Sequence, residues 1–241
     1  MTDNARLLSD LALRRFPGND GSVWTEPLIP QAEVEHFLAT ASATLVQAEL
    51  NEILLRAIRF RLDSAACSLE ISFISLYAAL ESILTFFRRQ DEFEILGAIE
   101  FGELERDLRK WLRQQPSLAA APAKRGLIYE KIRELNRFPF SSVFKTFCAQ
   151  YALDLSDLWP LVGVHAEWPL LEIRHRLVHG DPFEVRPVAA LACAREHLSW
   201  TVERMLLCVL GWPVERSSVS SQSLRSRKEH QSWPDERAKF A

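Results

Sequence analysis

The chain has 241 residues, of which 48% are hydrophobic and 25% are charged, a balance typical of one large globular domain, with or without appendages. Its eight glycines are too few for a β-rich chain of tight hairpins, and its net charge of -3 provides no overall attraction for a polyanion. No run of eighteen apolar residues and no secretory signal is present, so we expect a cytoplasmic protein with no membrane association.

The N-terminal thirty residues are predicted to lie outside the main domain. Residues 4–15 form a short amphipathic pattern with Leu7, Leu8 and Leu11 on one face. The following stretch, PGNDGSVWTEPLIP at 17–30, concentrates the residues of loops. We therefore interpret residues 1–30 as an N-terminal arm and a tethering loop.

Helical periodicity dominates from Gln31 onward. Apolar residues recur three and four positions apart through residues 50–87, which is typical of buried helical faces. Because this run is long for one helix, we expect a break near Asp63-Ser64. The sequence then predicts helices at 92–114, 126–136, 141–151 and 155–162, with a loop at 116–124.

Two further helices are predicted before the chain becomes polar. Pro169 opens one that Gly180 ends in the usual C-terminal glycine position, and Pro187 opens a long one that ends at Gly211. Residues 214–241 are poor in aliphatic side chains and predict a disordered, flexible tail. The expected fold is all-α, with a helical domain at 31–213 and no strand.

The four cysteines are scattered, without a CxxC pair or zinc spacing, and we expect buried free thiols and no cofactor: Cys67, Cys148, Cys193 and Cys208.

The densest polar cluster is EIRHRLVHGD at 172–181, which places Arg174, His175, Arg176 and His179 on one short helix. Three interpretations compete. The cluster can be a solvated helix end, where Arg and His complement the dipole. It can be a metal site, although no glutamate accompanies the two histidines and a third ligand is missing. It can also perform acid–base chemistry on a phosphate, with a histidine moving protons and an arginine holding the phosphate.

The run LLEIRHRLVHG resembles the signature of the HEPN superfamily, including its ApeA-like and RiboL-PSP-like domains: an arginine, a polar residue, three further residues and a histidine. The segment YAALESILTFF at 77–87 resembles an early helix of that family, with Glu81 at the acidic position. The ending LLCVLGW at 206–212 resembles the close of many members.

This resemblance implies a helical bundle of the HEPN type that forms a homodimer around a shared cleft. Active members are metal-independent endoribonucleases, often toxins or antiviral defence effectors with an antitoxin or partner protein. By the resemblance, Arg174 stabilises the phosphate, His179 acts as base or acid, and His175 orients its neighbours. Arg176 and Glu81 are predicted to contact the RNA. The alternative is a non-catalytic HEPN-like module that binds RNA, nucleotide or a protein. A third reading is a structural scaffold.

Overall fold

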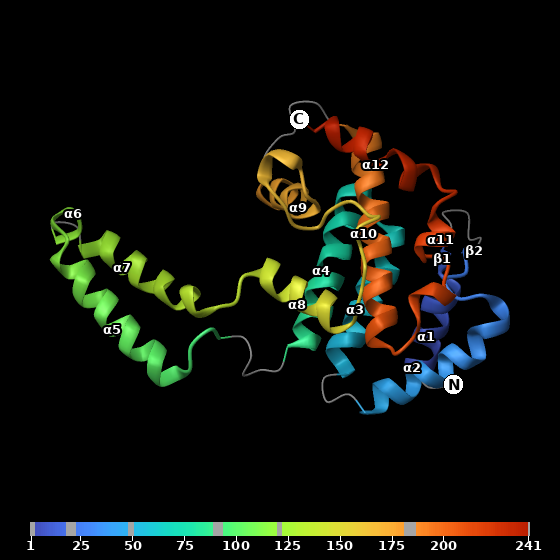
Figure 1. Ribbon diagram of the computed structural model, residues 1–241, viewed down its shortest axis with the longest axis horizontal. Helices are drawn as coiled ribbons and strands as arrows, with labels where there is room; N and C mark the ends of the chain where they lie inside the picture. Colours follow the sequence, from blue (N-terminus) through green and yellow to red (C-terminus); the bar gives the residue numbers. More distant parts are fainter. Residues whose placement is uncertain are drawn as a thin grey trace. The chain divides into compact units, whose positions relative to one another are not determined.

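The computed structural model describes residues 3–17, 23–47, 51–88, 94–119, 122–180 and 187–240 (Figure 1). Within these ranges the chain is helical apart from one pair of three-residue strands and one isolated bridge, so the all-α class is confirmed. The chain divides into two compact units. The first comprises Met1–Phe87 with Phe147–Ala241, and the second comprises Arg88–Thr146.

Three helices form the centre of the first unit: α3 (Asn51–Asp63), α4 (Leu69–Phe87) and α10 (Val188–Val209). α4 packs against both α3 and α10, as Figure 1 shows. The predicted break is confirmed, because the 3-10 turn η2 (Ser64–Ala66) separates α3 from α4. The Ser64 hydroxyl donates a hydrogen bond of 2.7 Å to the carbonyl oxygen of Arg61, which offers the backbone an alternative to continuing the helix.

Among the described helices, α4 alone has the length and apolar composition to cross a membrane. In this structure 44% of its most apolar window is buried inside the protein. The core helix of a globular domain has the same length and composition, so this property does not assign α4 to a membrane.

The N-terminal segment is part of the first unit, and its prediction as a separate arm is wrong. Helix α1 (Asp3–Leu13) packs against α2 (Val34–Gln47) and α3, and its Leu8 and Leu11 are buried. The predicted loop contains two short antiparallel strands, β1 (Arg15–Pro17) and β2 (Val23–Thr25). Strands of three residues are too short to produce a recognisable alternation in the sequence.

The C-terminal segment is folded, and the prediction of a disordered tail is wrong for residues 214–240. It forms the 3-10 turn η6 (Val214–Arg216), α11 (Ser221–Leu224) and α12 (Lys228–Ala238), and α12 packs against α10. Val219 and Leu224 are fully buried, and Phe240 is 8% exposed. The segment has few apolar residues, but these few lie in the core, which an average composition does not reveal.

The second unit contains a helical hairpin that the sequence did not separate from the main domain. Helix α5 (Ala98–Gln114) and helix α7 (Pro122–Ile132) are joined through the short helix α6 (Pro116–Ala119). The 3-10 turn η4 (Arg133–Asn136) follows α7, and α8 (Phe140–Gln150) crosses the boundary between the units. The predicted loop at 116–124 is wrong for residues 116–119 and 122–124, which are helical, while residues 120–121 lie outside the described part of the chain. Both prolines stand at the first position of a helix, where proline is tolerated.

Three smaller predictions also differ from the structure. The helix expected from residue 92 begins at Ala98, after Gly97 at its N-cap. Residues 155–162 form turns, and the Ser156 amide donates to the Asp154 carboxylate in a local turn that competes with a helix. The four cysteines are free, but of the four only Cys193 is buried, since Cys67 is exposed and Cys148 and Cys208 are half-buried.

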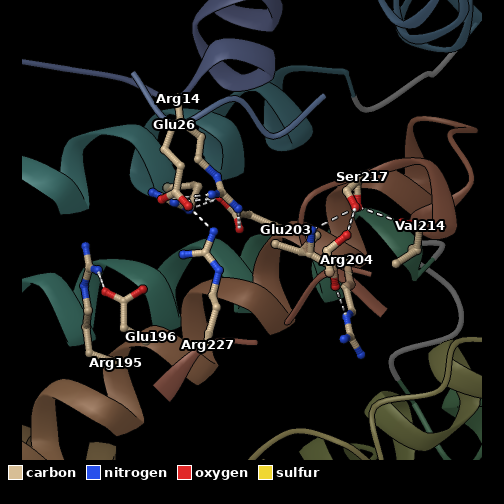
Figure 2. Close-up of polar contacts among 12 residues, drawn as sticks. Arg14, Glu26, Arg195, Glu196, Glu203, Arg204, Val214, Ser217 and Arg227 are labelled. Atoms are coloured by element: carbon tan, nitrogen blue, oxygen red, sulfur yellow. Dashed lines mark hydrogen bonds and ion pairs between the residues drawn. The ribbon is translucent and has the colours of Figure 1, made fainter. Parts of the chain in front are cut away.

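A buried ion triad joins the N-terminal segment to α10 (Figure 2). Glu203 is fully buried and accepts hydrogen bonds from Arg14 at 2.8 and 2.7 Å and from Arg61 at 3.1 and 2.6 Å. Burial by itself raises the pKa of Glu203, but the two guanidiniums outweigh it, and the net pKa is lowered. Figure 2 also shows Glu26 between Arg14 and Arg227, with which it forms ion pairs.

A second polar network lies next to it on α10. Arg204 is 1% exposed and donates two hydrogen bonds to Asp157, of 2.6 and 2.8 Å, and a third to the carbonyl oxygen of Val219. Burial opposes ionisation of Asp157, but Arg204 holds the pKa of this carboxyl below its usual range. The network therefore connects the C-terminal segment to the loop that precedes the helix predicted between Pro169 and Gly180.

His197 is another buried polar residue of α10. Its Nδ1 accepts a hydrogen bond of 3.0 Å from the Trp159 amide, so Nε2 carries the proton and donates to the carbonyl oxygen of Glu229, also at 3.0 Å. Burial lowers the pKa of His197 to about 4, and the structure holds it as a neutral ring.

This histidine makes the stability depend on pH. Because its pKa is about 4 in the folded protein and 6.5 in the reference state, the folded form binds fewer protons between these values. The contribution is complete above pH 6.5 and is lost as the pH falls toward 4, amounting to about 3 kcal/mol in total. We expect the unfolding free energy, measured with urea, to fall by about 1.4 kcal/mol per pH unit between 6 and 5.

The matched variant is His197→Gln, which removes the titrating ring. The free energy of unfolding of this variant should be lower at neutral pH, but it should no longer fall by about 1.4 kcal/mol per pH unit between pH 6 and 5. A variant with the slope of the wild type would show that another group is responsible.

Candidate functional site

The motif cluster lies on helix α9 (Leu170–His179), at the position predicted from Pro169 and Gly180. The amides of Leu170 and Leu171 donate to the carbonyl oxygens of Pro160 and Leu161, so the preceding loop satisfies part of the first turn. Gly180 ends the helix with φ +70°, and its amide donates to the carbonyl oxygen of Arg176. This left-handed conformation favours glycine, so the prediction of a C-terminal glycine cap is confirmed.

α9 packs on α4 through its apolar side, on which Leu170 and Ile173 are buried. Arg174 lies on the part of α9 nearest α4. Its Nη2 atom is 3.7 Å from the Glu81 carboxylate, and its guanidinium carbon is 5.3 Å from the centre of the Tyr77 ring. The structure therefore brings together Arg174 and Glu81, two residues 93 positions apart that the sequence had singled out separately.

Tyr77 also belongs to this site, although the sequence pattern does not predict it. It is 1% exposed, and burial raises its pKa well above the usual range, as does the neighbouring charge of Glu81, while Arg174 opposes them. The phenol is thus neutral at physiological pH, and its ring supports the guanidinium from below. A tyrosine in an apolar helical pattern gives no signal beyond that of a core residue.

His175 and His179 lie on consecutive turns at the exposed end of α9. Their ring centres are 4.4 Å apart, with 52° between the ring planes, and both residues are exposed. At 100° per residue, His179 lies about 140° from Arg174 around the helix axis. One copy of α9 therefore presents its two histidines together, but it does not present Arg174 and His179 toward the same point.

Arg176 belongs to a different cluster on the far flank of α9. Its Nε atom is 3.3 Å from Glu172, and its guanidinium carbon is 4.6 Å from the centre of the Trp168 ring. His165 completes the cluster, with Nδ1 2.7 Å from the second Glu172 oxygen. Arg176, predicted to contact RNA beside Arg174, is thus already engaged by Glu172 and Trp168.

The C-terminal segment supports the start of α9 through aromatic contacts. The Phe240 ring stacks on Trp168 at 5.4 Å and packs edge-on against Trp159 at 5.9 Å. Trp159 in turn donates a hydrogen bond of 2.9 Å from its indole nitrogen to the Trp168 carbonyl oxygen. The polar composition of residues 214–241, which predicts a flexible tail, gives no indication of this support.

The described residues include no group of three His, Cys, Asp or Glu side chains that could hold a metal ion. Two cavities of about 760 and 530 Å³ lie in the first unit, and no residue of α9 lines either of them. The larger is bordered by α4, α10 and α12, with charged groups of both signs such as Arg195 and Glu196. The motif residues are thus arranged on an outer surface of the single chain.

No protein-family model matches the chain, and comparisons with curated proteins and with solved structures found no match.

Proposed function

We propose that the protein is a metal-independent endoribonuclease of the HEPN type, with α9 as its catalytic helix. The observation that carries the proposal is the arrangement of this helix. Its buried side fixes Arg174 against Glu81 and Tyr77, while His175 and His179 stand exposed and adjacent at the glycine-capped end. A fixed cation and two titratable groups on the same helix suit the stabilisation and proton transfers of phosphate chemistry.

In the proposed reaction the 2′-hydroxyl of the RNA attacks the adjacent phosphorus. The new 2′-oxygen–phosphorus bond forms as the bond to the 5′-oxygen breaks, which leaves a 2′,3′-cyclic phosphate and a 5′-hydroxyl. A histidine accepts the proton of the 2′-hydroxyl, and a second imidazole supplies a proton to the leaving oxygen. We assign the two proton transfers to the His179 residues of two copies of the chain, each oriented by His175, and the stabilisation of the phosphate charge to Arg174.

A homodimer would complete this site. Because Arg174 and His179 lie about 140° apart around one helix, they do not face one phosphate from the same copy. A two-fold contact between two copies of α9 would place the arginine of one beside the histidine of the other. In this arrangement Glu81, whose carboxylate repels phosphate, would position Arg174 rather than bind RNA.

A second candidate function is binding without turnover, to RNA, a nucleotide or a protein partner. It is favoured by the ion pair between Arg174 and Glu81, which occupies the guanidinium in the single chain. The toxin or antiviral defence setting, with its neutralising partner, belongs to the catalytic proposal and rests on the HEPN resemblance.

Cleavage of a labelled single-stranded RNA in the presence of EDTA tests the catalytic proposal. We expect cleavage by the wild-type protein and a loss of about 10²- to 10⁴-fold in His179→Ala and Arg174→Ala, the range for removal of a general acid–base group. His36→Ala, at an exposed histidine of α2, is the matched control and should keep full activity.

Three results distinguish the alternatives. Products with 2′,3′-cyclic phosphate ends support the proposed reaction. Absence of cleavage by a folded wild-type protein, with RNA binding that Arg174→Ala abolishes, supports the binding module. Activity that EDTA removes contradicts metal independence.

A further inference from the structure

The second unit presents an apolar surface that the catalytic proposal does not use. Helices α5 and α7 run antiparallel, because the residues just before α5 contact the residues just after α7, and residues further along α5 contact α7 itself. Near one end, Leu96 and Asn136 exchange hydrogen bonds of 2.8 and 3.0 Å. Further along, the Tyr129 hydroxyl donates to the carbonyl oxygen of Arg109, whose guanidinium lies 4.7 Å from the Tyr129 ring centre.

The core between these helices is small. Phe101, Leu112 and Ile132 are buried, and three further side chains are partly buried against them. In the described part of this unit eight large apolar residues outside this core are exposed, among them Leu104 at 42%, Trp111 at 56%, Ile128 at 37% and Leu135 at 61%. A pair of helices with so little buried between them gains stability mainly by covering such residues.

These four residues lie on one face, which we call the hairpin face. Leu104 and Trp111 are seven positions apart on α5. Around the helix axis, both are displaced in the same direction from the buried side that carries Phe101 and Leu112. Ile128 and Leu135 have the same spacing on α7 and η4. Because the two helices are antiparallel, the displacement on α7 falls on the same side of the pair. The result is a continuous apolar strip rather than scattered exposed residues.

The two edges of the hairpin face carry opposite charges. On α5 the exposed Glu100 and Asp107 lie beside Leu104 and Trp111. On α7 the exposed Lys124 and Lys131 lie beside Ile128, and Lys131 also pairs with Glu134. One edge of the face is therefore acidic and the other is basic.

We propose that the hairpin face binds a second copy of the chain, forming an antiparallel four-helix bundle. A two-fold axis parallel to the helices places α5 of each copy over α7 of the other, so that each acidic edge meets a basic edge. An axis across the helices places α5 over α5 and opposes like charges, which disfavours it. The register of the hairpin sets Asp107 level with Ile128, between Lys124 and Lys131 of the other copy.

This interface is separate from the contact between α9 helices, so a chain that uses both contacts forms an assembly larger than a dimer, and substitutions on the hairpin face test this contact alone. Sedimentation or light scattering of the full chain should give at least twice 27.6 kDa at micromolar concentration. Trp111→Asp should weaken the association about 100-fold or more, as expected for a buried aromatic residue at the centre of an interface. Ile99→Asp, at an 83% exposed site away from the hairpin face, should leave it unchanged.

Charge exchange tests the orientation of the two copies. Asp107→Lys should weaken the dimer about tenfold, and Lys124→Glu in the same chain should restore most of the loss. Circular dichroism and thermal melting verify that each variant is folded.

A wild-type monomer, or a Trp111→Asp variant that associates as strongly as the wild type, overturns the proposal. A stronger association in Asp107→Lys overturns the parallel axis. Weakened association in Trp111→Asp with RNA cleavage retained supports two independent contacts, one at the hairpin face and one at α9.

Discussion

Replacing Glu203 with alanine is expected to lower the free energy of unfolding by about 3–5 kcal/mol, one of the largest single-residue effects in this protein. The substitution leaves Arg14 and Arg61, each 4% exposed at the side chain, without the carboxylate that accepts their four hydrogen bonds. A buried cation that loses its counter-ion keeps its desolvation penalty. Urea unfolding followed by tryptophan fluorescence measures the change.

The matched control is the exposed ion pair between Glu33 and Arg216, 2.8 Å apart. Glu33→Ala removes a carboxylate of the same chemistry where water replaces it, and should cost less than about 1 kcal/mol. If the Glu203 variant does not fold, Glu203→Gln keeps the size of the side chain and part of its hydrogen bonding. A Glu203 variant as stable as the Glu33 variant would contradict the structural importance of the triad.

Ending the chain after Pro213 is expected to abolish cooperative folding of the first unit at 37 °C. The truncation exposes the surface covered by Val219, Leu224 and Phe240, each worth roughly 1.5–3 kcal/mol when buried. It also removes the carbonyl groups that accept hydrogen bonds from Arg204 and His197. The sum is a large fraction of the roughly 5–15 kcal/mol by which proteins of this kind are stable. Calorimetry shows the loss as a missing or strongly lowered transition.

A milder variant keeps this prediction measurable if the truncated chain aggregates. Leu224→Ala should cost about 2–4 kcal/mol, the range for a fully buried leucine. Arg225→Ala, at the adjacent exposed position, should change the stability by less than about 0.5 kcal/mol. Equal effects at the two positions, or a truncated chain with the wild-type transition, would restore the interpretation of a flexible tail.

The local features of the motif helix could be read from the sequence. Pro169 and Gly180 mark its ends, because proline restricts its own φ angle and glycine allows the left-handed conformation. Neither property depends on a distant residue. The break between α3 and α4 is of the same kind. Arg174 and Glu81 are both site candidates by the HEPN resemblance, but their ion pair could not be predicted. It depends on how α9 packs on α4.

The polar composition of residues 214–241 and the loop-forming residues at 17–30 predict a tail and an arm, but both segments contribute to the first unit through single residues. Arg14 looks like a surface residue in the sequence, yet it lies beside Glu203, 189 positions away. Glu203, Arg204 and His197 interrupt the apolar pattern of the last long helix. This interruption was the signal available in the sequence, since charged groups inside a buried helix need partners.

The helical class, most helix positions and the chemistry available on α9 follow from the sequence alone, because periodicity, caps and residue types are local properties. The contacts of Arg174 and of Arg176, and the packing of the N-terminal and C-terminal segments into the first unit, follow from the three-dimensional structure. These depend on contacts between residues far apart in the chain. Such contacts form where burial of apolar surface and pairing of buried charges outweigh the entropy of ordering the segments, a balance that no single segment contains.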